Sequence, residues 1–109
     1  MTEHTLKEKE EILSILQILS SNPQITQREI SSRLGISVGK TNYLLKELIK
    51  KGLIKKVVRF KEPSLKLRRI RYLLTSKGFA EKAGLIYMFF KKKEAEYQEF
   101  KRIWEESKV

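Results

Sequence analysis

The chain has 109 residues, enough for one domain with a single modest core. It carries 24 Lys and Arg against 13 acidic residues, all of them Glu, for a net charge of +11. Cys and Asp are absent and His4 is the only His, so disulfides, a cysteine nucleophile, a Ser-His-Asp triad and the usual zinc ligand sets are excluded. We therefore expect no enzyme activity, no metal and no cofactor.

The sequence shows no targeting or membrane signal. The first residues are charged and lack the apolar core of a signal peptide. The longest apolar run, residues 83–90, is far shorter than the ~20 residues that span a bilayer. The expected location is the cytoplasm, with no membrane partner.

The positive charge is concentrated in the middle of the chain. Residues 38–78 contain 13 Lys and Arg but only two Glu, whereas the parts before and after are close to neutral. Charged stretches are often only solvated surface, but solvation does not require such an excess of one sign. The pattern favours a polyanionic partner, most often nucleic acid. A membrane surface is the weaker alternative, because this stretch does not read as one amphipathic helix.

Two capping boxes mark the first two predicted helices. In each box a Thr is followed three residues later by Glu, so that the two side chains satisfy the first backbone N–H groups. The boxes are Thr5 with Glu8 and Thr26 with Glu29. An apolar stripe with helical spacing follows the first box: Ile12, Ile15, Leu16 and Leu19. The first helix is expected to stop at residues 22–23, and the second, about two turns long, at Gly35.

A third helix and a β-hairpin come next. The helix is expected from Val38 to about Lys51, and its inward side holds Thr41, Leu44, Leu45 and Leu48. Beyond Gly52 the spacing of apolar residues changes from the 3.6 residues of a helix to the two residues of a strand. Residues 53–61 and 67–74 therefore predict the two strands of a hairpin around a short polar turn.

The last helix is predicted from Phe79 to about Glu106. When the helix is read in repeats of seven residues, two positions of each repeat are apolar, as in the seam of a coiled coil. Lys93 is the one exception at these positions. This seam comprises Phe79, Ala83, Ile86, Phe90, Tyr97, Phe100 and Trp104. As far as Phe90, packing on its own domain competes well with pairing to a second copy. No sequence is left to cover the later residues, so we expect a homodimer in which the helix direction stays open. The predicted dimerisation residues are Phe90, Tyr97, Phe100 and Trp104.

The order of elements predicts a mainly α fold with a small β-hairpin. It is a winged helix-turn-helix at residues 1–78, followed by a long C-terminal dimerisation helix at residues 79–109. The stretch from residue 25 to residue 54 resembles the winged helix-turn-helix of prokaryotic transcription regulators. Within these, Ser37-Val-Gly-Lys, Asn42-Tyr43 and Tyr72-Leu-Leu-Thr-Ser-Lys-Gly most resemble the small MarR-type regulators associated with exopolysaccharide gene clusters.

The resemblance covers about residues 10–100 and implies both function and partners. It implies a homodimeric regulator of transcription that binds specific double-stranded DNA sequences, with the third helix in the major groove. Larger MarR proteins have more helix outside the wing, and that helix forms a pocket for small phenolic effectors. This chain has little helix to spare, which argues against a small-molecule effector.

The third helix and the wing supply the candidate DNA-binding residues. Asn pairs with adenine, Lys reaches guanine acceptors, and a capping Ser at a helix N-terminus can hold a phosphate. The candidates of the third helix are Ser37, Val38, Gly39, Lys40, Asn42, Tyr43, Lys46 and Lys50. For Tyr43, a half-buried cover over the helix pair is as good an interpretation as a DNA contact. On the DNA backbone or in the minor groove we expect the residues nearest the tip of the wing: Lys66, Arg68 and Arg69.

Other functions remain open at this point. An architectural protein that coats or bridges DNA without a target sequence would show the same charge, but it would not need Asn and Tyr at reading positions. A protein–protein interaction module is disfavoured by the positive field.

Overall fold

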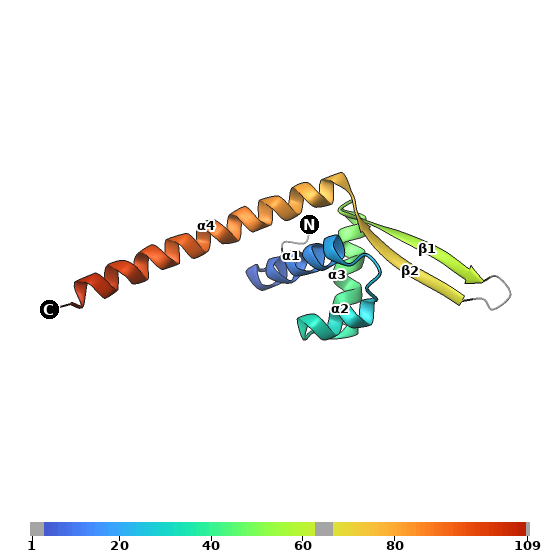
Figure 1. Cartoon of the computed structure of the whole chain (residues 1–109), viewed down its shortest axis with the longest axis horizontal. Helices are drawn as coiled ribbons and strands as arrows, with labels where there is room; N and C mark the ends of the chain where they lie inside the picture. Colours follow the sequence, from blue (N-terminus) through green and yellow to red (C-terminus); the bar gives the residue numbers. More distant parts are fainter. Residues whose placement is uncertain (1–3, 63–66, 109) are drawn as a thin grey trace.

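The computed structural model describes residues 4–62 and 67–108 and has the predicted order of elements (Figure 1). The elements are α1 (Leu6–Ser21), α2 (Gln27–Leu34), α3 (Val38–Lys50), β1 (Ile54–Glu62), β2 (Leu67–Leu74) and α4 (Ser76–Glu106). This confirms the mainly α fold with a small hairpin. The predicted start of the last helix was wrong: α4 begins at Ser76 rather than Phe79. The reason is local, because the Thr75 hydroxyl caps the helix by accepting the N–H of Gly78 at 3.0 Å.

The other predicted helix ends are confirmed. Both capping boxes form, with each Thr hydroxyl accepting the N–H of the Glu three residues on. Ser37 caps α3 by accepting the N–H of Lys40 at 3.0 Å. Gly35 ends α2 in the left-handed conformation, with φ of +66°, which favours Gly because it has no Cβ.

The core lies where α1, α2 and α3 meet the base of the hairpin and the start of α4. The apolar stripe of α1 and the inward side of α3 are buried, as predicted. The remaining buried apolar residues are Ile25, Ile30, Leu53, Ile54, Tyr72 and Leu85. Since every element contributes, the core fixes α3 relative to the hairpin and to α4.

A buried polar contact joins the two helices of the helix-turn-helix. The hydroxyl of Ser31 in α2 donates to the hydroxyl of Thr41 in α3 at 2.7 Å. Thr41 in turn donates to the carbonyl of Ser37 at 3.0 Å. Buried hydroxyls are costly unless they are hydrogen-bonded, so this chain of bonds favours one angle between α2 and α3.

The hairpin is antiparallel and begins directly after α3. Ile54 pairs with Leu74 at its base, and the register continues to Glu62 opposite Leu67, with an irregularity between Phe60 and Glu62. Figure 1 shows the hairpin projecting from the helical body on the side away from the C-terminus. The fold therefore places the wing beside the C-terminal end of α3.

Helix α4 has an anchored beginning and a projecting end. Leu85 is buried in the core and Met88 packs against it. Beyond these residues the helix extends away from the body, and with the hairpin on the opposite side it gives the chain a long dimension of 75 Å (Figure 1). Ion pairs one turn apart follow along it: Lys91–Glu94, Lys92–Glu96, Lys93–Glu96, Arg102–Glu99 and Arg102–Glu106. Pairs of this spacing on the surface of a helix support it only weakly, because water and salt screen them. The predicted division at residues 78 and 79 stays a prediction, and α4 runs across it.

Gly78 allows α4 to lie against the end of α3, and we expect Gly78→Ala to destabilise the fold. A Cβ at this position would sit 2.0 Å from the carbonyl oxygen of Leu53, so the backbone would have to shift. Overpacking of this kind costs about 1–3 kcal/mol. Chemical denaturation should therefore show a clear loss of unfolding free energy.

Gly84→Ala is the matched control for this prediction. Gly84 lies in the same helix, and a Cβ there would meet no atom within 4 Å. Helix propensity alone then favours Ala, by up to about 1 kcal/mol. Equal effects of the two substitutions would contradict the close contact at Gly78.

Within the described residues, no helix combines the length and the apolar character that crossing a membrane requires.

Candidate nucleic-acid interface

The outward side of α3 carries most of the candidate residues on one surface. Gly39, Tyr43, Lys46 and Lys50 are exposed and lie opposite the buried stripe of the helix. Ser37 and Val38 are exposed at its leading end. We call these six residues together the reading face: Ser37, Val38, Gly39, Tyr43, Lys46 and Lys50. These residues share one surface because of the helical period. When one side of α3 buries Thr41 and three Leu residues, the positions on the other side point outward.

Lys40 and Asn42 lie on the two flanks of the reading face rather than at its centre. Both are partly buried. In a helix of 3.6 residues per turn, the positions immediately before and after the buried Thr41 point to opposite sides. Lys40 faces α1, where the carboxylate of Glu8 lies 2.6 Å from its ammonium group. Asn42 is on the other flank.

Tyr43 is partly covered by its own chain, and a DNA contact of this residue stays a prediction. Its side chain is 37% exposed, at the border between a covered and a free residue. The ammonium of Lys40 lies 5.3 Å from the centre of its ring, within the range of a cation–π contact. The ring of Tyr43 is therefore in contact with Lys40 of the same helix, and its exposed part belongs to the reading face.

Sequence reasoning missed two contacts of α3. The Gln27 side chain in α2 donates to the Val38 carbonyl at 3.3 Å, which ties the start of α2 to the start of α3. Glu8 was recognised only as a capping residue, yet it also pairs with Lys40. Neither contact leaves a local signal, because its partners lie 11 and 32 residues apart in the sequence.

The ion pair between Glu8 and Lys40 keeps both groups charged. The Glu8 carboxylate accepts hydrogen bonds from the Lys40 ammonium and from the Thr5 N–H. Both stabilise its charged form and lower the pKa of the Glu8 carboxyl below its usual value. The same pair raises the pKa of the Lys40 ammonium. At neutral pH α3 therefore holds a lysine whose charge is already matched within the chain.

The predicted wing contacts fall largely outside the described part of the structure. Lys66 lies outside the described residues, and so do the side chains of Arg68 and Arg69. Lower on the hairpin, Lys55 and Lys56 of β1 are exposed. The basic character of the wing thus extends to its base, next to the end of α3.

The seam predicted on α4 faces away from the domain. Leu85 and Met88 make the contact with the core, whereas all seven seam residues are exposed. Phe100 is 71% exposed and Trp104 is 62% exposed. Packing of the seam on its own domain, which competed well as far as Phe90, is therefore wrong. The helix period explains this, because one side of α4 is used by the core and the seam lies on the other.

A cavity of about 500 Å³ lies between α1, the end of α3 and the beginning of α4. Its apolar wall is formed by Ile12, Leu48, Leu53 and Leu85, and its polar residues are His4, Lys9, Lys51, Lys77 and Glu81. This volume falls within the range of small-molecule sites. The absence of a small-molecule effector stays a prediction, because a cavity of this size is large enough for a small ligand.

Comparisons with known proteins agree with this geometry. Residues 12–55 match the family described as winged helix-turn-helix DNA-binding. No curated protein matches the chain. Among solved structures, a MarR family transcription regulator is 20% identical with a TM-score of 0.62, over 86% of this chain and 65% of its own. The transcriptional repressor CouR, bound to a 23-mer DNA duplex, is 28% identical with a TM-score of 0.63, over 81% of this chain and 59% of its own. A PadR-like transcriptional regulator from Bacillus cereus strain ATCC 14579 is 24% identical with a TM-score of 0.71, over 87% of this chain and 94% of its own.

The chain therefore has the winged helix-turn-helix fold, and its residues 12–55 match the winged helix-turn-helix DNA-binding family. The predicted resemblance to MarR-type transcription regulators is confirmed in the fold. The chain spans only about two thirds of the MarR-type chains, at 65% and 59% of their lengths. The narrower resemblance to regulators of exopolysaccharide clusters stays a prediction.

Proposed function

We propose that this chain is a homodimeric transcription regulator that binds specific double-stranded DNA sequences. In this proposal α3 enters the major groove, and the basic wing contacts the backbone or the minor groove. The observation that carries it is the reading face, an exposed polar and basic surface on a helix whose other side is locked into the core. The similarity to CouR, a repressor bound to duplex DNA, supports it. Such a protein would act in the cytoplasm, where the DNA lies.

The charge distribution supports the same proposal. Residues 38–78, with 13 basic and two acidic residues, include α3 and both strands of the wing. Lysines on α3 and at the base of β1 are exposed. Exposed lysines on α3 and at the base of the hairpin are suited to contact the phosphates of the DNA backbone.

The exposed seam of α4 supports the dimer. Large apolar stripes are rare on the surface of a monomer, and a helix that projects from its domain has no other cover within the described residues. Pairing of two α4 helices would place two reading faces on one DNA duplex, with half-sites about 10 bp or a multiple apart.

Selection of bound sites from random duplex DNA tests the proposal. A dimer with two equivalent reading faces should enrich a palindrome with that half-site spacing. Enrichment of no sequence, with binding retained, would instead favour the architectural function.

Asn42→Ala is expected to relax base preference at one defined position of each half-site. Asn42 flanks the reading face, and an Asn that pairs bidentately with adenine contributes about 1–3 kcal/mol of discrimination. Lys50→Ala is the control, since a phosphate contact at the end of α3 should weaken all sequences alike. Affinities for a panel of single-base variants of the selected site measure both effects. An unchanged ranking of sites in Asn42→Ala would show that this residue does not read bases.

A further inference from the structure

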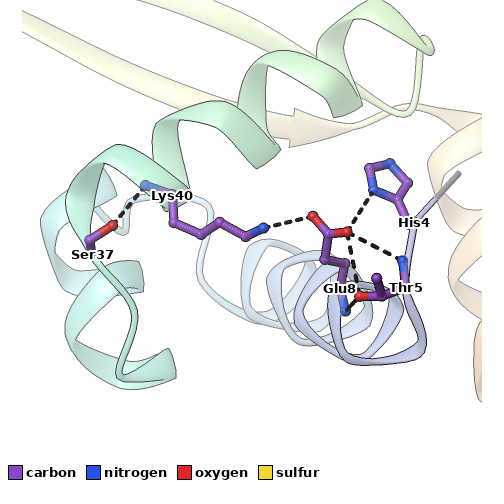
Figure 2. Close-up of polar contacts among 5 residues, drawn as sticks. All are labelled: His4, Thr5, Glu8, Ser37 and Lys40. Atoms are coloured by element: carbon purple, nitrogen blue, oxygen red, sulfur yellow. Dashed lines mark hydrogen bonds and ion pairs between the residues drawn. The ribbon is translucent and has the colours of Figure 1, made fainter. Parts of the chain in front are cut away.

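Glu8 connects the N-terminal helix to the recognition helix α3. Its carboxylate lies between three groups: the Lys40 ammonium, the backbone N–H of Thr5 and the imidazole of His4 (Figure 2). The Glu8 side chain is only 19% exposed, and that of Lys40 is 35% exposed. The pair is thus partly shielded from water, at the edge of the surface proposed to bind DNA.

The two carboxylate oxygens of Glu8 have different partners. Oε1 accepts the N–H of Thr5 at 3.2 Å and completes the capping box of α1. Oε2 accepts from the ammonium of Lys40 at 2.6 Å. Only the first of these contacts is required by α1, so the second is an additional function of the same side chain.

Lys40 occupies an unfavourable position in its own helix. It is the third residue of α3, the position at which α1 and α2 carry the Glu of their capping boxes. The N-terminus of a helix has a partial positive charge, which favours an anion there and disfavours Lys. The Glu8 carboxylate compensates for this charge from another helix.

We propose that Glu8 competes with DNA for Lys40 and thereby sets the affinity of the interface. The inference rests on the proposed function of α3. In the free chain the Glu8 carboxylate pairs with the ammonium of Lys40. In the complex a phosphate of the DNA backbone replaces Glu8 as the partner of Lys40. The Lys40 ammonium lies 5.3 Å from the centre of the ring of Tyr43, a residue of the reading face, so it is already next to the surface proposed to bind DNA.

The exchange lowers the affinity for every duplex, whatever its sequence. Binding must break an ion pair before Lys40 contacts a phosphate, and the released carboxylate then repels the DNA. A part-exposed ion pair of this kind corresponds to a factor of about two to five in an equilibrium constant. Glu8 therefore restrains non-specific binding without contacting a base.

Glu8→Gln separates the two functions of the side chain. Gln retains an oxygen for the capping box, and this motif accepts Gln in place of Glu. When that oxygen serves the cap, the NH2 group takes the place of Oε2, and an NH2 group donates but cannot accept a hydrogen bond from the ammonium of Lys40. We expect Glu8→Gln to bind duplex DNA about two- to fivefold more tightly at low salt and to have a slightly lower melting temperature. A purely structural role of Glu8 would lower the affinity and the stability together.

Two further variants make the test specific to Lys40. Glu10→Gln removes the same charge from an exposed position of α1 and should raise the affinity less. In a Lys40→Met background, the gain from Glu8→Gln should fall to that of Glu10→Gln, which reflects the loss of one negative charge alone. The inference is overturned if Glu8→Gln binds no more tightly than Glu10→Gln, or if its gain is undiminished without Lys40. Absence of any duplex binding by the unmodified chain would instead overturn the proposed function itself.

Discussion

Truncation of the chain after Lys92 is expected to give a folded monomer that binds its DNA site far more weakly. The contacts of α4 with the core end at Leu85 and Met88, so the truncated chain keeps all of them. It loses Tyr97, Phe100 and Trp104, which are exposed in the single chain. Without a second tethered reading face, the affinity gain from two linked half-sites, about 10²–10⁴, is lost.

Sedimentation and DNA affinity measure the two parts of this prediction. Sedimentation of the truncated chain should give the mass of a monomer, and its melting temperature should show that the domain remains folded. A truncated chain that remains a tight dimer would place the interface elsewhere. Helix α1 is then the next candidate, although its apolar stripe is already buried in the core and leaves mainly Leu6 exposed.

A pair of substitutions tests the seam in the full chain. Phe100 lies on the seam and Ile103 lies outside it, and both are exposed near the end of α4. Phe100→Glu should weaken the dimer strongly, because it places a charge in an apolar interface. Ile103→Glu introduces the same charge one turn away, at the edge of the seam rather than within it, and should weaken the dimer less.

Local signals predicted the fold well because each helix end depends on residues close together in sequence. The two Thr-Glu boxes, Gly35 and Ser37 all act within a few residues, and the structure shows each of them in its predicted role. The same holds for the inward side of α3. A helix buries one stripe and exposes the rest, so the reading face follows from the apolar period alone.

Local sequence patterns could not predict the contacts between elements that are distant in the chain. The link from Glu8 to Lys40 depends on how α1 crosses α3, which no local spacing records. The start of α4 is set by the local cap of Thr75, whose hydroxyl also donates to the carbonyl of Gly52 at 2.6 Å, a contact across 23 residues that no local pattern records. Gly78 was placed just before the helix, but it lies within α4 and allows the close approach of this helix to Leu53.

Duplex binding is expected to weaken steeply with salt, by about 10³–10⁵ between roughly 50 and 200 mM for a dimer with about 6–10 phosphate contacts. The net charge of +11 lies almost wholly in α3 and the hairpin, the elements proposed to contact DNA. Each phosphate that a Lys or Arg neutralises releases condensed cations from the DNA. This release becomes less favourable as the salt concentration of the solution rises. Titration of the affinity against salt concentration measures the effect directly.

Charge-removing variants show which lysines produce the salt dependence. Lys46→Gln and Lys50→Gln, on the reading face, should each reduce the slope of log affinity against log salt by about one per chain. Lys101→Gln removes the same charge from an exposed position near the far end of α4 and should leave the slope almost unchanged. A flat titration of the unmodified chain would contradict nucleic-acid binding altogether. Equal effects of all three variants would show that net charge acts at long range, rather than through phosphate contacts of α3.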